Sequence, residues 1–137
     1  MSTNSSIQQL HAALGGYYEQ WRMLTLAEGE AIAASQWPQV EYLQCAKQNL
    51  RRRIEITTRE LLAECAKHGL DAQQAEAEFH PLLQKLIALE GHNAQALEAQ
   101  QRQARKQEVD LRAASAKLRQ LKRAYTPRPE ALWQSYS

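Results

Sequence analysis

Few residues of this chain have the type and spacing that metal or catalytic chemistry requires. Glu76 and His80 are four residues apart, a spacing that would place two metal ligands on one face of a helix. No third ligand follows at a matching spacing, and nothing marks a nucleophile with a base beside it. We therefore predict no metal site, no cofactor and no catalytic residues, that is, a binding protein and not an enzyme.

Basic side chains are the second candidates for chemistry. Arg51-Arg52-Arg53 could suggest an anion site, but three successive residues of a helix point in different directions. Lys and Arg number 17 against 15 Asp and Glu, so the net charge is only +2. Such a balance gives no electrostatic reason to expect nucleic acid. A further basic group is interleaved with acids and glutamines and lacks aromatic residues for base stacking: Arg102, Arg105, Lys106, Arg119, Lys122 and Arg123.

The two thiols and the terminus bear on compartment. Cys45 and Cys65 share one predicted helix, where twenty residues separate them by about 30 Å, too far for a disulfide. Residues 1–6 are polar and do not resemble a signal peptide, and no apolar run is long enough to span a bilayer. We expect a cytoplasmic protein with free thiols and no membrane insertion.

Apolar repeats and breakers predict the elements that carry these residues. Pro38, Gly69 and Pro81 separate the repeat-bearing segments, and Asp71 with Gln74 fits a capping box. The predicted helices cover residues 5–35, 38–68 and 82–125, with a short helix at 72–79 and a tail at 126–137. The predicted fold is one all-α domain over residues 1–137, an elongated antiparallel three-helix coiled-coil bundle with a long third helix and a short C-terminal tail. A kink at Gly15-Gly16 is left open.

The expected core is specific enough to test. The second helix should bury one face through Val40, Leu43, Leu50, Ile54, Leu61 and Cys65. In the third helix, Asn93, Gln100 and Gln107 occupy seam positions, where a buried polar residue can set register at a cost in stability. Asn93→Leu should then raise the melting temperature, unless the helix rotates these side chains into water. Leu50→Asp or Leu97→Asp should be severely destabilising.

The third helix has a seam longer than its neighbours can cover. It outlasts each of the other two by roughly 20 Å, so the stripe beyond about Arg112 should lack a partner within the bundle. An amphipathic partner helix could lie along such a stripe. The predicted binding residues are Leu111, Ala114, Leu118 and Leu121, with Leu132 and Trp133 of the tail.

Three stretches resemble the FlgN-like flagellar export chaperones, a family of small helical proteins. One runs from Leu26-Ala27-Glu28-Gly29-Glu30-Ala31 to Ser35-Gln36-Trp37-Pro38-Gln39-Val40, followed by Lys47 and Leu50. The second is Glu90-Gly91-His92-Asn93 with Ala96-Leu97, and the third is Leu118, Leu121 and Ala124-Tyr125. The tail departs from the family pattern, with Pro127, Pro129 and Trp133 where a short polar tail is expected.

The resemblance implies an export chaperone of the cytoplasm. It would bind the C-terminal helical region of hook-associated proteins, prevent their premature assembly and deliver them to the flagellar type III export gate. Tyr125 would contact that gate. A structural or adaptor coiled coil and a chaperone for the filament-cap protein are the alternatives, and a homodimer is left open.

Overall fold

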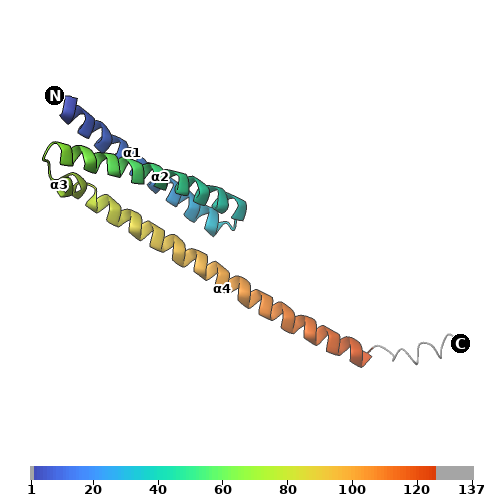
Figure 1. The fold of residues 1–137 in the computed structure, drawn as a ribbon. Helices are drawn as coiled ribbons and strands as arrows, with labels where there is room; N and C mark the ends of the chain where they lie inside the picture. The colour runs from blue at the N-terminus through green and yellow to red at the C-terminus, as the bar shows by residue number, and fades with distance from the viewer. Residues whose placement is uncertain (1, 126–137) are drawn as a thin grey trace. The chain divides into compact units, whose positions relative to one another are not determined.

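The computed structural model describes residues 2–125, which form four helices and no strand (Figure 1). They are α1 (Ser2–Ala33), α2 (Trp37–Lys67), α3 (Ala72–Ala77) and α4 (His80–Tyr125). The predicted all-α class is confirmed. The chain divides into two compact units, residues 1–97 (unit 1) and 98–137 (unit 2), and each is described by itself. The predicted tail, with Leu132 and Trp133, lies outside the described residues.

The connection between α1 and α2 is short and has a defined backbone. Ser35 has φ 56°, the left-handed conformation that ends many helices. The Gln36 amide donates to the Ala31 carbonyl over 2.9 Å, which closes the last turn of α1. Pro38 lies in the first turn of α2, where its missing amide hydrogen is not needed. The break at Pro38 is therefore confirmed, with α1 ending two residues before the predicted boundary.

The segment after α2 also follows the predicted signals, with one difference in detail. Gly69 has φ 70° just past the end of α2, as a glycine cap requires. Asp71 caps α3 through its carboxylate, which accepts from the Gln73 amide over 3.0 Å. The predicted capping box pairs Asp71 with Gln74, the third residue of the helix, whereas the cap hydrogen bond in the structure joins Asp71 to the Gln73 amide. α4 begins at His80, two residues earlier than predicted, because Pro81 fits a first helical turn.

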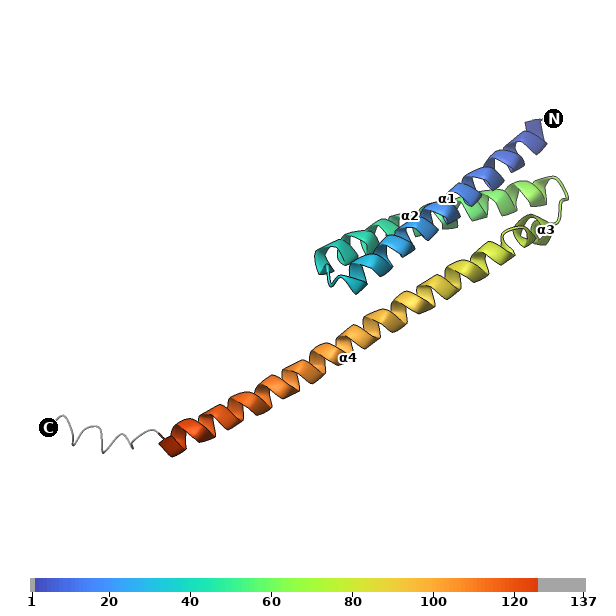
Figure 2. The ribbon, with the colours of Figure 1, turned by 180° about the vertical axis from the view of Figure 1, so that it is seen from behind.

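Unit 1 is built on an antiparallel pair, since α1 and α2 lie side by side and run in opposite directions (Figures 1 and 2). One buried cluster joins Leu14, Leu61, Cys65 and Phe79. A second lies nearer the α1–α2 connection and joins Ala31, Ile32, Val40 and Leu43. Partly buried residues of α4 pack on both clusters: Leu83 on the first, Ala96 and Leu97 on the second.

The Gly15-Gly16 pair lies inside α1, which remains helical through it. A methyl group at Gly15 would lie 3.4 Å from Cε1 of Phe79, whereas nothing lies within 4 Å of one at Gly16. The Phe79 ring stacks on His11 at 4.4 Å between centroids and meets Tyr18 edge-on at 5.2 Å. A methyl group at Gly15 would therefore make ordinary van der Waals contact with the aromatic ring that closes this end of the core.

The buried face of α2 agrees with prediction at five of six positions. Val40, Leu43, Leu50, Leu61 and Cys65 are buried, and Ile54 is partly buried. Arg51-Arg52-Arg53 are exposed, which fits a solvated face. Two residues of the buried face were not predicted, Lys47 and Thr57.

Two expectations from composition also have structural counterparts. Cys45 and Cys65 are both free thiols, the first exposed and the second buried. Within residues 2–125, none of the helices has the combination of length and apolar character that crossing a bilayer needs.

Candidate functional sites

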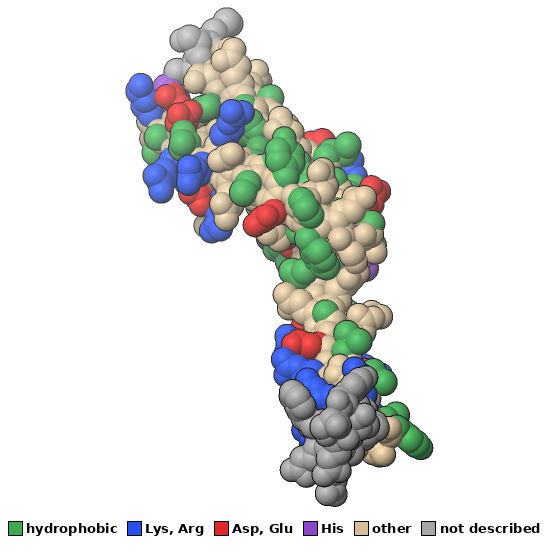
Figure 3. All heavy atoms as spheres, turned by 90° about the vertical axis from the view of Figure 1, so that its right-hand side faces the viewer, with side chains coloured by type: hydrophobic (Ala, Val, Ile, Leu, Met, Phe, Trp, Pro, Cys, Tyr) green, Lys and Arg blue, Asp and Glu red, His purple; other side chains and the backbone are tan. Residues whose placement is uncertain are grey.

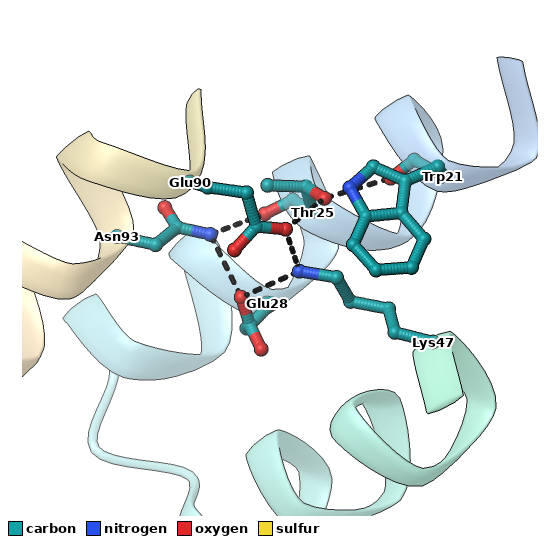
Figure 4. A network of polar contacts seen from close by, with 6 residues as sticks. All are labelled: Trp21, Thr25, Glu28, Lys47, Glu90 and Asn93. Atoms are coloured by element: carbon teal, nitrogen blue, oxygen red, sulfur yellow. Dashed lines mark hydrogen bonds and ion pairs between the residues drawn. The ribbon is translucent and has the colours of Figure 1, made fainter. Parts of the chain in front are cut away.

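Unit 1 contains a polar network at the level where α1, α2 and the first part of α4 meet (Figure 4). Trp21, Thr25 and Glu28 come from α1, Lys47 from α2, and Glu90 and Asn93 from α4. Four of its members, Thr25, Glu28, Lys47 and Asn93, are buried. A charged group of this kind inside a thin helical core must be satisfied by close partners.

Lys47 is the centre of the network. Its Nζ lies 3.3 Å from Oε1 of Glu28 and also pairs with Oε1 of Glu90. The same ammonium group lies 4.7 Å from the centroid of the Trp21 ring, a cation–π distance. The side chains of Lys47 and Glu28 are only 7% and 5% exposed, whereas that of Glu90 is 38% exposed. Glu28 is therefore the carboxylate that depends most on Lys47.

Asn93 connects the network to the backbone of α1. Its Nδ2 donates to the Thr25 carbonyl over 2.7 Å and to Oε1 of Glu28 over 3.0 Å. A methyl group at Gly29 would lie only 2.7 Å from Oδ1 of Asn93, too close for a real Cβ. Gly29 thus allows the Asn93 amide to approach α1.

The geometry of this network suits the alignment of helices. Thr25 Oγ1 lies 2.7 Å from the Trp21 carbonyl and 3.1 Å from Oε1 of Glu90, and its single proton can serve one of them at a time. Every buried side-chain nitrogen and oxygen of the described residues has a hydrogen-bond partner. A satisfied buried network fixes which residues face each other, since a shifted register would leave charges unpaired.

The seam prediction for α4 holds at one position and fails at another. Asn93 is buried, as a register-setting residue should be, and Gln100 is partly buried. Gln107 is exposed, so there the alternative applies and the side chain faces water. Asn93→Leu should therefore not raise the melting temperature, because leucine would leave Glu28 with one donor fewer.

The sequence did not single out Glu28, Lys47 and Glu90 as one site. Lys47 falls on the predicted buried face of α2, midway between Leu43 and Leu50, and a lysine there was the available signal. Glu90 lies seven residues after Leu83 and seven before Leu97, so it also occupies a seam position. Opposite charges at seam positions of different helices indicate a buried ion pair when they are read together.

The described part of unit 2 carries four of the predicted binding residues, and Tyr125, on one helix. Leu111, Leu118, Leu121 and Tyr125 are 67%, 61%, 52% and 83% exposed, and Ala114 is exposed as well. We call Leu111, Ala114, Leu118 and Leu121 the C-terminal stripe, which Tyr125 follows on the same face. Their spacing alternates between three and four residues, which places them on one face of α4.

Charged side chains lie beside the C-terminal stripe. Figure 3 shows apolar side chains at the surface next to basic ones. Arg112 pairs with Glu108 at 2.6 Å along the helix, and both side chains are largely exposed. Asp110 and Lys117 have no ion-pair partner among residues 2–125. Because Asp110 and Lys117 are seven residues apart, the stripe has an apolar centre and unpaired charges of both signs along one edge.

A groove of about 380 Å³ opens on the surface of unit 1. Arg51 and Glu90 contribute charged groups to its lining. The other lining residues are mostly apolar: Tyr18, Trp21, Ile54, Leu83, Leu86 and Ile87. Ile87 is 70% exposed, so the groove offers apolar area to water beside the network.

Burial raises the pKa of Tyr18 above its usual range, with a smaller contribution from the charge of Glu76, while a hydrogen bond with Thr58 opposes the shift.

The structure separates the two residues first considered as metal ligands. Glu76 belongs to α3, whereas His80 is the first residue of α4, so they do not share a helix face. No group of three potential ligands is close enough to hold a metal ion within residues 2–125. Two other histidines approach carboxylates, His11 with Glu78 at 3.2 Å and His68 with Glu64 at 3.5 Å.

Comparisons of the chain with protein-family models, with curated proteins and with solved structures found no match.

Proposed function

We propose that this protein is a cytoplasmic export chaperone of the FlgN-like type, a binding protein without catalytic activity. The C-terminal stripe would receive an amphipathic helix from the C-terminal region of a hook-associated flagellar protein, prevent its premature assembly and escort it to the type III export gate. Tyr125 would contact the gate after loading. We further propose that α1, α2 and the first part of α4 form an antiparallel three-helix bundle.

The exposure of the stripe is the observation that carries this proposal. Leu111, Leu118 and Leu121 are each more than half exposed on one face of a helix, although such residues usually contribute to cores. An aligned apolar stripe on one helix is the surface that a partner helix needs, with an anchor every three to four residues. Tyr125 adds apolar area and a hydroxyl with few rotamers to immobilise, which is typical of interface anchors.

The resemblance supplies the second support. Two of its stretches, which are far apart in the sequence, contribute Glu28, Lys47, Glu90 and Asn93 to the network of unit 1. Gly29, from the same first stretch, provides the space that Asn93 occupies. The residues behind the resemblance thus include a group that acts together in the fold.

The binding test compares two faces of the same helix. Calorimetry would titrate the full chain with the C-terminal helical segment of a hook-associated protein. Leu118→Ala and Leu121→Ala should each weaken binding by at least about 1 kcal/mol, the range for interface anchors. Val109→Ala is the matched control, because Val109 is 63% exposed but lies on the opposite face of α4. Wild-type affinity for the doubly substituted stripe would refute the cargo site.

Delivery and the tail are tested separately. Tyr125→Ala should leave cargo affinity unchanged and reduce export in a flagellated host. We propose that Leu132 and Trp133 cap the stripe when cargo is absent. Truncation after Tyr125 should then tighten cargo binding and leave the melting temperature nearly unchanged. A clear loss of thermal stability would instead mean that the tail seals the core.

An adaptor coiled coil is the second candidate function, favoured by the seven-residue repeat of Ala104, Leu111, Leu118 and Tyr125. A chaperone for the filament-cap protein is the third. Titrating the filament-cap segment beside the hook-associated segment distinguishes the two cargoes. An adaptor would bind neither segment.

A further inference from the structure

The described part of unit 2 is a single helical segment with a coiled-coil repeat and no covering element of its own. From Gln101 to Tyr125 every residue is exposed. One repeat position carries Ala104, Leu111, Leu118 and Tyr125, and the companion position carries Gln107, Ala114 and Leu121. We infer that a second copy of this chain covers this face in an antiparallel arrangement, with Leu111 of each copy opposite Ala114 of the other.

The sizes of the seam residues favour that register. In an antiparallel pair, each repeat position faces the companion position of the other helix. Leu111 then faces Ala114 and Ala104 faces Leu121, so four of the six layers between residues 104 and 121 set a leucine against an alanine. The other two layers set Leu118 against Gln107. A parallel pair would instead set Ala114 against Ala114 and Gln107 against Gln107, leaving thin or polar layers.

The charges at the edge of the seam favour it independently. In this register Asp110 of each copy lies beside Lys117 of the other, which gives two symmetric attractive pairs. Neither residue has an ion-pair partner among residues 2–125, so both are available. These pairs lie next to the Leu111–Ala114 layers, at the centre of the interface.

Competing arrangements set like charges together. Shifting the pair by one repeat places Asp110 opposite Asp110 in one direction and Lys117 opposite Lys117 in the other. The shift that sets Lys117 opposite Lys117 also brings Lys122 near Glu108, but Glu108 already forms an ion pair with Arg112 along the helix. A parallel pair places Lys117 beside Lys122 on both sides. Only the proposed register combines attractive charges with alternating sizes.

This inference does not require the chaperone role. It uses the same face as the proposed cargo site, so a dimer and a cargo complex would exclude each other. Its test contains no cargo, and the two proposals can therefore fail separately.

Sedimentation equilibrium of the full chain should show a reversible monomer–dimer equilibrium between micromolar and submillimolar concentration. Lys117→Asp should weaken the dimer by about tenfold or more, because two attractive pairs become repulsive. Asp110→Lys combined with Lys117→Asp restores both pairs in reversed polarity and should return the dissociation constant to within about threefold of the wild type.

Arg119→Asp is the matched control. It makes the same change of charge on the same exposed helix, but Arg119 lies outside the seam and its flanks, so the dimer should be unaffected. A chain that stays monomeric throughout would overturn the inference. So would a charge swap that fails to restore the dimer. A dimer that Lys117→Asp strengthens would be parallel, since that variant turns the Lys117–Lys122 repulsion into attraction.

Discussion

The two parts of α4 carry one sequence pattern and meet opposite environments. In unit 1, Leu86 and Asn93 occupy seam positions and are 5% and 6% exposed. In unit 2, Leu121 occupies the same position of the repeat and is 52% exposed, and Leu118, at the companion seam position, is 61% exposed. A repeat therefore shows which residues lie on one face of a helix, and not whether anything covers that face. The covering is decided by residues elsewhere in the chain.

The largest expected difference in unfolding free energy is between a charge placed in the core of unit 1 and a charge placed on the exposed stripe of unit 2. Leu50→Asp in the core of unit 1 should cost at least about 4 kcal/mol of unfolding free energy, because it buries an unpaired carboxylate. At a concentration where the chain is monomeric, Leu118→Asp should change the unfolding free energy by less than about 0.5 kcal/mol, since Leu118 is 61% exposed within the chain. Leu97→Asp should fall between them, because Leu97 is only partly buried.

Denaturant melts followed by circular dichroism would measure these differences. If Leu50→Asp does not fold, Leu50→Ala replaces it, with an expected cost of about 2–4 kcal/mol. A large loss from Leu118→Asp would mean that the stripe is covered in the free chain, and the contrast between the two parts of α4 would be lost.

The second comparison removes one ion-paired cation from each unit. Lys47→Met leaves Glu28 buried without its cation and should cost about 3 kcal/mol. Arg112→Met breaks the exposed pair with Glu108 and should cost no more than about 0.5 kcal/mol. Adding Glu28→Gln to Lys47→Met should recover part of the loss, because the uncompensated charge is removed. Equal costs for the two single variants in thermal melts would argue against a buried network.

The third comparison uses two glycines of α1. Gly16→Ala should stabilise the protein by about 0.5–1 kcal/mol, because nothing lies near the added methyl and alanine favours helix. Gly29→Ala should destabilise it instead, because the methyl would meet Oδ1 of Asn93 at 2.7 Å. In an Asn93→Ala background that contact is gone, and Gly29→Ala should become stabilising. A favourable Gly29→Ala in the wild type would show that the Asn93 amide is not held against α1.

The smallest effect concerns alkaline pH. The pKa of Tyr18 is raised above its value in the unfolded chain, so the folded state favours the neutral phenol. Its stabilising contribution is present below the unfolded pKa and is lost as pH rises through the folded pKa. Tyr18→Phe should therefore lose less stability than the wild type between about pH 9 and 11, a difference below about 1 kcal/mol because Tyr18 is partly exposed. If the stabilities of the two proteins fell equally with rising pH, the pKa of Tyr18 would not be raised by folding.

Prediction from sequence succeeded where local chemistry decides the structure. Pro38 and Gly69 mark helix boundaries because their backbone preferences act within a few residues, and Asp71 caps α3 for the same reason. Leu50 and Leu61 were assigned to the core because the repeat of α2 is regular. The positions at which burial differed from the prediction are those whose burial depends on contacts with other helices.

Lys47 and Gln107 illustrate that dependence in opposite directions. Lys47 is charged and yet buried, because Glu28 from α1 and Glu90 from α4 meet it. Gln107 shares a repeat position with Asn93 and yet faces water. The stripe was predicted to bind a partner because α4 is longer than the helices that could cover it, and the exposure of the stripe agrees with this reasoning. The identity of the partner depends on molecules outside the chain.

The placement of the two cysteines has a kinetic consequence. Cys45 and Cys65 lie on the same helix, one exposed and the other 1% exposed within the Leu14–Leu61–Phe79 cluster. A thiol reagent can reach Cys45 at all times, but it reaches Cys65 only when that cluster opens. Under conditions of rapid reclosing, the ratio of the two labelling rates gives the fraction of time that the cluster is open. The native sequence thus contains both a reporter of local opening and its internal reference, with no cysteine to introduce by mutation.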